Sequence, residues 1–371
     1  MIYLDNAATT FKKPDSVIHE VKKCIKKCSA NPGRSGHILS HRASELLYDT
    51  RVKVARLFNY SKPENVVFTL NATYGLNIAI KTLLNKKGHV IMSDREHNSV
   101  LRPIRKMCDL IGIEYSIYNS RAENVFFEIE GHIRDDTYAI ISTLASNVTG
   151  ETIPIFLLSE LKRKHGLTLI LDASQAAGHI PIDLSEIEFD ALVAPGHKAL
   201  FGIMGVGFVI LNTTPSSSFI EGGSGSDSRN EYMPPELPEL MEAGTVPLPA
   251  IASLGAGLDF LMRSRIECIE GRISYLTELL FETLSDIKGI TVYGAENGIV
   301  AFNLDSKLAE EVSRFLSDRD ICVRSGLHCA PLAHKSIGTY ETGCVRASIS
   351  YFNTEREIRR FADALLKAKG E

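Results

Sequence analysis

The sequence lacks the features that mark several protein classes. Its 371 residues carry a net charge of -4, and no segment combines a basic stripe with interleaved aromatic residues. Because such a stripe is typical of a nucleic-acid groove, we expect no nucleic-acid partner. No stretch of about 18 apolar residues is present, and the opening MIYLDNAATT does not resemble a signal peptide. We therefore expect a cytoplasmic protein without a membrane partner.

The seven cysteines form no recognisable framework. Because their number is odd and they are scattered, the sequence predicts no set of disulfides. Cys24 and Cys28 would share one face of a helix, but no second pair follows at zinc-like spacing. We therefore expect no metal site, and at least one thiol kept for its reactivity.

The length predicts more than one packed unit, because 371 residues exceed most single cores. Residues 221–249 are rich in Gly, Ser, Pro and acidic residues, which is typical of a long loop that is functional or disordered. Helical pattern resumes from Ile251 to about Leu284. We expect an N-terminal arm (1–14) that joins a smaller C-terminal domain (251–371), and a large domain (15–250) between them.

Strands that are apolar throughout alternate with helices in the first half of the chain. Residues 89–93, 138–143 and 167–171 are such strands, and residues 99–111 and 154–165 have helical patterns. This alternation predicts an α/β fold with a mostly parallel sheet covered on both faces. Ligand groups collect at the carboxyl ends of strands in such sheets. The polar residues that directly follow predicted strands are Thr73, Asn147, Asp172, His197 and Lys198.

Lys198 lies between an apolar run and a glycine-rich apolar run in FDALVAPGHKALFGIMGVGF. Burial there would remove water from its ammonium group, lower its pKa and make the amine a nucleophile. A lysine that forms a Schiff base needs these properties. Taken alone, the segment is explained better by a surface lysine in a loop, so the choice depends on the rest of the chain.

Two further segments offer groups that suit a phosphorylated pyridine ring. In LILDASQAAG, a buried Asp172 at a strand end could hold a pyridine nitrogen protonated, and capping a turn is an equally good interpretation. In FTLNATYGLN, free N–H groups at a helix start and the Thr73 hydroxyl would suit a phosphate. A simple N-cap role for Thr73 explains that segment equally well.

His97 in REHNSV and Asn147 in SNVTG also follow predicted strands. The imidazole could stack on an aromatic ring or move a proton, and the amide could donate to a phenolic oxygen. Each is more often an ordinary loop or turn residue. Together, however, a Schiff-base lysine, an acid for a ring nitrogen, a phosphate-binding helix start and a stacking histidine predict pyridoxal 5'-phosphate.

Nine segments in a fixed order resemble a known family. They are YLDNAATT, FTLNATYGLN, REHNSV, SNVTG, LDASQAAG, APGHK, EAGT, and RSGLHCAP followed by VRAS. This order is similar to the class V aminotransferase group of fold-type I pyridoxal phosphate enzymes, and most similar to the branch of cysteine desulfurases and selenocysteine lyases. The resemblance covers nearly the whole chain. It implies a mostly parallel seven-stranded sheet in the large domain and a smaller α+β C-terminal domain.

The resemblance implies roles for the residues around the cofactor ring. Lys198 matches the lysine that binds the cofactor covalently, and Asp172 matches the partner of the pyridine nitrogen. His97 matches the stacking histidine, to which we also assign a catalytic role. Gln175 and Asn147 match donors near the ring oxygen, and Asn147 is also expected to contact substrate.

The resemblance also assigns the phosphate end and the substrate carboxylate. Ala72, Thr73 and His197 match phosphate-side positions. Thr245 matches a threonine that in relatives reaches the phosphate of the partner subunit, so a homodimer is expected. Arg346 matches the arginine that binds the substrate carboxylate, a task that suits a bidentate guanidinium.

Two positions depart from the family pattern. Relatives commonly have Gly-Thr-Thr where this chain has Asn71, Ala72 and Thr73, and a Ser or Thr at the position of Pro195. Both changes remove hydroxyl contacts to the phosphate. They leave open how tightly the phosphate is held, but not the covalent bond to the lysine.

Cys329 in VRSGLHCAP matches the persulfide-forming cysteine of the family. Positive charge from Arg324, nearby in sequence, would favour the reactive thiolate, although a small buried cysteine is the alternative. The short interval to Arg346 resembles the subgroup with a compact, less mobile cysteine loop. We expect Cys344 to be structural.

The resemblance thus implies a cysteine desulfurase that converts L-cysteine to L-alanine and passes sulfur from Cys329 to an acceptor protein or small thiol. Which pathway it would serve, iron-sulfur cluster assembly, tRNA thiolation or another, stays open. Two alternatives stay open. A selenocysteine lyase or an aminotransferase would use the same ring-binding residues, and a non-catalytic sulfur carrier or scaffold would keep only the fold.

Overall fold

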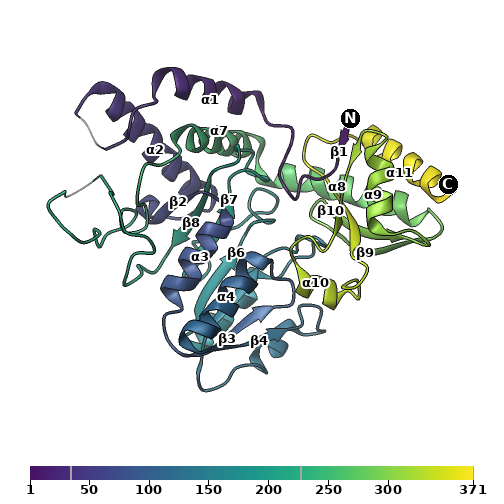
Figure 1. The fold of residues 1–371 in the computed structure, drawn as a ribbon, viewed down its shortest axis with the longest axis horizontal. Helices are drawn as coiled ribbons and strands as arrows, with labels where there is room; N and C mark the ends of the chain where they lie inside the picture. The colour runs from purple at the N-terminus through teal and green to yellow at the C-terminus, as the bar shows by residue number, and fades with distance from the viewer. Residues whose placement is uncertain (34–35, 226–227, 371) are drawn as a thin grey trace.

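The computed structural model describes residues 1–33, 36–225 and 228–370 (Figure 1). Its centre is a seven-stranded sheet in which β8 runs antiparallel to both of its neighbours and every other pairing is parallel. This confirms the predicted mostly parallel seven-stranded sheet. In spatial order the strands are β2 (Val66–Thr69), β8 (Gly207–Leu211), β7 (Ala191–Pro195), β6 (Thr168–Asp172), β5 (Thr137–Thr143), β3 (Gly88–Ser93) and β4 (Ile113–Tyr118).

The apolar strands are explained by burial on both faces of this sheet. Successive side chains of a strand point to opposite faces, so a strand that is covered twice is apolar at every position. In β6, Leu169 and Leu171 lie in one apolar core and Ile170 lies in the core on the other face. The predicted α/β class follows from this arrangement.

Helices cover the two faces. Leu76 of α3 and Ile104 of α4 belong to one core, and Leu158 of α6 and Ile251 of α7 belong to the other. The helices of this part are α1 (Asp15–Lys27), α2 (Ile38–Leu57), η1 (Pro63–Asn65), α3 (Ala72–Leu83), α4 (Asn98–Ile111), α5 (Val125–Glu130), α6 (Ile155–His165) and α7 (Leu248–Ser264).

The C-terminal part is built on a four-stranded antiparallel sheet with the order β12-β13-β10-β9. Its strands are β9 (Ile290–Glu296), β10 (Ile299–Leu304), β12 (Arg324–Gly326) and β13 (Cys344–Ser348), and its helices are α8 (Ile266–Ser285), α9 (Ala309–Ser317), α10 (Pro331–Ser336) and α11 (Glu355–Gly370). Helices and an antiparallel sheet around a core of their own match the expected α+β character.

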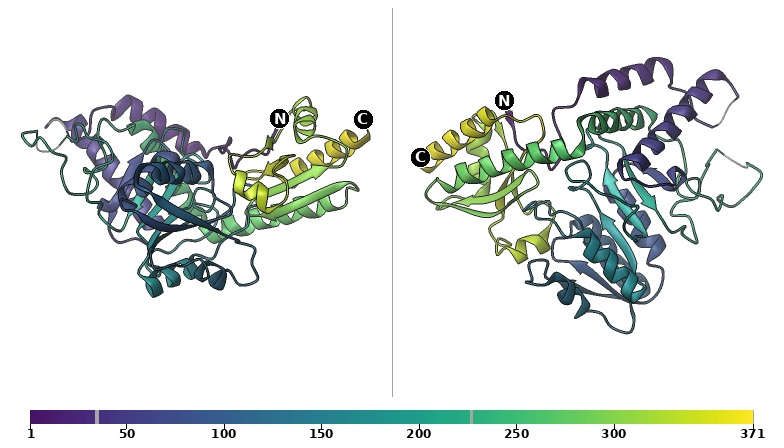
Figure 2. Two further views of the ribbon diagram at one scale, coloured as in Figure 1. Left: turned by 60° about the horizontal axis from the view of Figure 1, so that its bottom comes forward. Right: turned by 180° about the vertical axis from the view of Figure 1, so that it is seen from behind.

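The chain's first residues lie against this C-terminal part, so both ends of the chain belong to the same lobe (Figures 1 and 2). Strand β1 (Ile2–Tyr3) pairs in parallel with β11 (Ile321–Cys322). Ile2 and Leu4 belong to the C-terminal apolar core. The N-terminal arm therefore packs against the C-terminal part of the protein, and the chain continues from there to the large sheet.

The helical pattern predicted from residue 251 to 284 is divided into two helices. Arg265, with φ of +63°, separates α7 from α8. Helix α7 packs against α1 and α2, whereas α8 packs against β9. The domain division at residue 251 stays a prediction, but the packing of α7 argues for placing it with the large sheet.

The connection between β8 and α7 contains no helix or strand within its described residues, 212–225 and 228–247, which confirms the predicted long loop. Across the described parts of the chain, none of the helices has the length and apolar character needed to cross a membrane.

Candidate active site

A cavity of about 220 Å³ opens at the carboxyl ends of the central strands. Thr143, Asp172 and Pro195, which end β5, β6 and β7, form part of its wall. The structure brings most of the predicted site residues together here. Those that line the cavity are Ala72, Thr73, His97, Asn147, Asp172, Gln175, His197, Lys198 and Arg346.

Lys198 lies three residues beyond the end of β7, and its Nζ has no hydrogen-bond or ion-pair partner among the described residues. Burial lowers the pKa of Lys198 to about 8, against the attraction of Asp172, which raises it. The side chain is thus a buried amine that exists partly in its neutral, nucleophilic form near neutral pH. Asp172 is buried at the end of β6, and its Oδ1 accepts a hydrogen bond of 2.9 Å from the Ser174 N–H.

His97 caps the start of α4. Its Nδ1 accepts a hydrogen bond of 3.1 Å from the Ser99 N–H, so the proton of the neutral ring lies on Nε2. Burial lowers the pKa of His97 to about 4, although Asp172 raises it. An uncharged imidazole in this wall suits stacking on an aromatic ring.

The N-terminus of α3 provides donors for an anion. The N-cap is Asn71, whose Oδ1 accepts from the Tyr74 N–H at 2.9 Å, so the N-cap role considered for Thr73 is wrong. The N–H groups of Ala72 and Thr73 have no acceptor within the described residues. Thr73 Oγ1 lies 2.7 Å from the hydroxyl of Ser99, which also lines the cavity. Ser99 thus adds a hydroxyl that sequence analysis missed.

The N-terminal arm closes another side of the cavity, which sequence analysis also missed. Ala7 and Ala8 line it, and the Ala7 carbonyl accepts a hydrogen bond of 3.0 Å from Nε2 of Gln175. His197 Nδ1 lies 3.0 Å from Thr9 Oγ1. Burial, followed by the charge of Lys198, lowers the pKa of His197 to about 4. The arm therefore fixes two of the predicted cofactor residues.

Arg346 is 1% exposed, and two of its three guanidinium nitrogens are bonded within the protein. Nη1 donates to the Asn147 carbonyl and Nη2 to Asp5 Oδ1, both at 2.8 Å. Nε is buried without a partner among the described residues. This remaining donor can serve an incoming carboxylate. Sequence analysis missed Asp5, whose partner lies 341 positions away.

Cys329 lies at a neighbouring cavity of about 370 Å³, which shares Thr73, His97 and Ser99 with the first. Its side chain is exposed, and its Sγ lies 4.0 Å from Nη2 of Arg324. Cys329 therefore lines the second cavity and not the first, whereas His97 lines both. The buried alternative considered for Cys329 is wrong.

Cys344 is buried, and burial raises the pKa of its thiol to about 12. A thiol with so high a pKa is unreactive near neutral pH. Cys344, His328 and His334 nevertheless bring three groups of the kind that bind metals within 4.8 Å of one another, which sequence analysis did not find.

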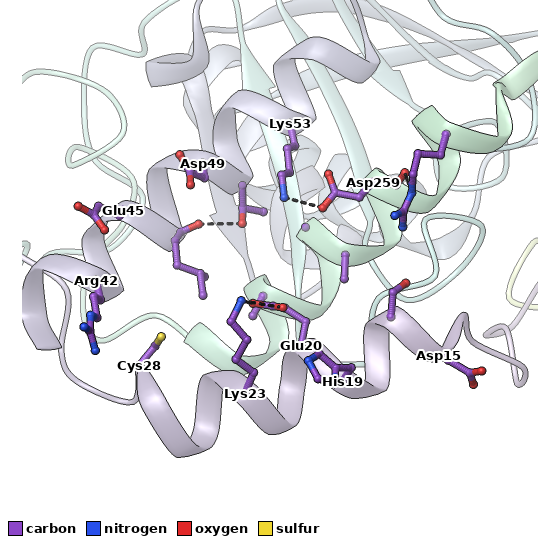
Figure 3. A pocket seen from close by; sticks show the side chains of 17 residues that line it. Asp15, His19, Glu20, Lys23, Cys28, Arg42, Glu45, Asp49, Lys53 and Asp259 are labelled. Atoms are coloured by element: carbon purple, nitrogen blue, oxygen red, sulfur yellow. Dashed lines mark hydrogen bonds and ion pairs between the residues drawn. The ribbon is translucent and has the colours of Figure 1, made fainter.

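Thr245 is exposed in the loop before α7 and does not line the cavity of its own chain. Its predicted role toward a partner subunit stays a prediction. A larger cavity of about 670 Å³ lies between α1, α2 and α7 and contains none of the predicted site residues (Figure 3).

Comparison with known proteins identifies the family. A profile of the family Aminotransferase class-V matches residues 2–361. A protein of Methanothermobacter thermautotrophicus described as a probable cysteine desulfurase is 32% identical over 382 residues, covering 100% of this chain and 95% of that protein. The apo structure of a cysteine desulfurase from Thermococcus onnurineus is 27% identical with a TM-score of 0.92, covering 100% of this chain and 94% of that one.

A more distant structure shares the fold and is described as holding glycine covalently linked to its PLP cofactor. It is 21% identical, with a TM-score of 0.82 and coverage of 98% of this chain and 96% of that one. The match of the family profile across nearly the whole sequence, with the same fold in the solved structures, shows that the chain belongs to the class V aminotransferase family.

Proposed function

We propose that this protein is a pyridoxal phosphate-dependent cysteine desulfurase, which converts L-cysteine to L-alanine and leaves the substrate sulfur on Cys329 as a persulfide. The observation that carries the proposal is the position of an exposed thiol at a cavity that shares Thr73, His97 and Ser99 with the cavity of the buried amine of Lys198. An aminotransferase has no use for a thiol at this place.

The residues of the cavity fit the cofactor. Lys198 provides an amine without a partner, and Asp172 provides a buried carboxylate at the end of the adjacent strand. The free N–H groups of Ala72 and Thr73 suit a phosphate. When bound, the cofactor would supply an electron-accepting pyridinium ring that stabilises negative charge at the substrate α-carbon.

The chain's own residues then bind the substrate and move its protons. Arg346 would bind the carboxylate through its unpaired Nε and an adjacent Nη group, while Asp5 and Asn147 hold the guanidinium in place. Lys198, with a pKa of about 8, would take the proton from the α-carbon. His97, which burial keeps neutral, would remain against the ring.

The sulfur transfer itself is assigned to Cys329. The thiolate sulfur of Cys329 bonds to the sulfur of the substrate, and the bond between that sulfur and Cβ breaks. The electron pair of the broken bond stays with the carbon, which takes up a proton and becomes the methyl group of alanine. Cys329 thus ends as a persulfide, and no external oxidant or reductant is needed.

The sulfur acceptor, a protein or a small thiol, would reach Cys329 from the outer cavity. That cavity is lined by Lys81, Arg102 and Lys106 and by no acidic residue. The acceptor then takes the sulfur at the outer cavity, where Cys329 lies.

A homodimer is part of the proposal. Thr245 is exposed and does not line its own chain's cavity, so we assign its contact with a phosphate to a second copy of the chain. Sedimentation of the purified protein tests this: a monomer at all concentrations would contradict it.

The test of the function is the substitution Cys329→Ala in the holoenzyme. We expect alanine formation from L-cysteine to fall by about 10³-fold, because the nucleophile is removed. Binding of L-cysteine, followed by the cofactor's absorbance change, should be retained. Cys268→Ala, which removes an exposed thiol elsewhere, is the control. Undiminished alanine formation in Cys329→Ala, or faster amino transfer to an oxo acid than desulfuration, would contradict the proposal.

A further inference from the structure

His328 directly precedes Cys329, and its ring is hydrogen-bonded to the ring of His334. Both side chains are buried, at 3% and 0% exposure, and Nδ1 of His328 lies 3.2 Å from Nε2 of His334. The rings are nearly parallel, with an interplanar angle of 11°, and their centroids are 5.4 Å apart. The separation of the centroids exceeds that of the nitrogens by nearly the sum of the two distances from a ring centre to its nitrogen. The two nitrogens therefore lie close to the line between the centroids, and the rings meet edge to edge.

The direction of hydrogen bonding through this pair is determined at one end. His328 Nε2 lies 3.3 Å from the Arg324 carbonyl, which can only accept, so Nε2 carries the proton and Nδ1 is an acceptor. His334 must therefore donate through Nε2 and accept at Nδ1 from the Thr339 hydroxyl, 2.7 Å away. Burial lowers the pKa of His328 to about 2 and that of His334 to about 4, which keeps both rings neutral as this chain of donors requires.

The same geometry argues against a metal ion in this cluster. Two ligand nitrogens and the Cys344 sulfur lie within 4.8 Å of one another. A bound ion, however, needs both nitrogen lone pairs to converge on a point beside the line between them. Here the nitrogens face each other along that line, and a proton shared between them fills the space.

The hydrogen-bonded pair lies next to a strained segment of backbone at residues 328 and 329. His328 and Cys329 have φ values of +50° and +56°, a region that residues with a side chain rarely adopt unless the surroundings hold them there. Asn147 Nδ2 bonds the His328 carbonyl at 2.8 Å, and the Asn98 N–H bonds the Cys329 carbonyl at 2.7 Å. These two bonds hold the backbone, whereas His334 holds the ring of His328.

We propose that His334 is a positioning residue for Cys329. His334 donates to Nδ1 of His328 and so holds the ring in the orientation in which its Nε2 bonds the Arg324 carbonyl. That second bond closes the segment from Arg324 to Cys329 into a loop. The closed loop keeps the Arg324 guanidinium 4.0 Å from the Cys329 sulfur and keeps that sulfur at the cavity it shares with His97. The effect on sulfur transfer rests on the proposed function, but the effect on the local geometry of the thiol does not.

The test compares two pairs of variants of the holoenzyme. His334→Ala removes the donor, whereas His334→Gln places an amide N–H near the position of Nε2. Thr339→Val removes only the hydroxyl that orients the chain of donors, and Thr339→Ser keeps it. Two properties are measured: kcat and KM for alanine formation, and the rates at which Cys329 reacts with the anion iodoacetate and with neutral iodoacetamide.

The ratio of the two alkylation rates reports the positive charge beside the thiol. We expect His334→Ala to lower this ratio about fivefold and kcat about tenfold with KM little changed, because a misplaced reacting group slows the chemical step. His334→Gln should restore most of both losses. Thr339→Val should show a smaller loss of the same kind, which Thr339→Ser lacks.

Three results would overturn the proposal. In the first, His334→Ala lowers only the melting temperature, which would make His334 an ordinary core residue. In the second, the two Thr339 variants behave alike, and this pair decides the matter if His334→Ala does not fold. In the third, the purified protein holds a stoichiometric metal that Cys344→Ala loses. If instead Cys329→Ala still forms alanine, the proposed function fails, while the alkylation ratio still tests the role of His334.

Discussion

The candidate active site and a larger surface cavity of this protein differ in how their charged side chains are paired. The cavity between α1, α2 and α7 is three times larger, at about 670 Å³ against 220 Å³ (Figure 3). Both of its lysines are paired: Lys53 with Asp259 at 2.7 Å, and Lys23 with Glu20 at 2.9 Å. In the smaller cavity, Lys198 has no partner within the described residues, and Arg346 Nε has none either.

The difference teaches that buried nitrogens of cationic side chains that lack a partner, rather than volume, mark the candidate site. Holding an amine or a guanidinium nitrogen out of water without a partner costs free energy, so the arrangement persists where a ligand completes it. Paired charges at a half-exposed surface contribute about 0 to 1 kcal/mol each and carry no such implication.

The largest expected effect comes from removing the unpaired amine. Lys198→Ala should abolish covalent cofactor binding and lower alanine formation by at least about 10³-fold, because both nucleophile and base are lost. Absorbance of the purified protein and product analysis measure the two effects. Lys53→Ala, in the larger cavity, is the matched control and should keep full activity; equal losses in both variants would break the comparison.

Removing the unpaired guanidinium nitrogen should have the next largest effect. Arg346→Lys keeps the positive charge but loses the planar fork, so we expect KM for L-cysteine to rise about 100-fold. Steady-state kinetics measures this change. Arg263→Lys, which lines the larger cavity, should leave KM unaltered. An unchanged KM in Arg346→Lys would show that the carboxylate binds elsewhere.

The rate at which the apoprotein takes up cofactor should depend on pH in a way that reports Lys198. Only the neutral amine reacts with an aldehyde, and its pKa is lowered from 10.5 to about 8 by burial. The rate should therefore rise about tenfold per pH unit below pH 8 and level off above it. Stopped-flow absorbance at constant ionic strength follows the reaction. A rise that continues to pH 10 would indicate an ordinary, solvated lysine.

The smallest expected effect concerns the hydroxyl of Ser99. Ser99→Ala removes the partner of Thr73 Oγ1 at the proposed phosphate end, so we expect the cofactor to bind about fivefold more weakly, the cost of one hydrogen bond. Equilibrium titration of the apoprotein measures the change. Ser16→Ala is a close control, since Ser16 lines the larger cavity and its buried hydroxyl has no partner within the described residues. Weaker binding in both variants would mean a general loss of stability.

The sequence predicted those site residues whose positions follow from a local pattern of strands and helices. Asp172 and Lys198 could be located because each follows an apolar strand, and parallel strands bring their carboxyl ends to one edge. The N-cap of α3 was missed because Asn71 and Thr73 are both residues that commonly cap helices, and only the backbone geometry distinguishes them.

The site residues that sequence analysis missed contact partners that lie far away in the sequence. Asp5 meets Arg346, Ala7 meets Gln175, and Thr9 meets His197, each pair more than 100 positions apart. No periodicity carries such information. The His328–His334 pair is close in sequence, but its edge-to-edge contact depends on the turn between residue 328 and α10.

The parallel pairing of β1 with β11 has a consequence for how the protein is made. The first strand to leave the ribosome has no partner until Ile321 and Cys322 have been synthesised. The wall formed by Ala7 and Ala8 is therefore among the last parts of the cavity to be completed. A nascent chain that has already folded its central sheet still lacks a finished pocket, so competence to bind small molecules arises only after translation has nearly ended.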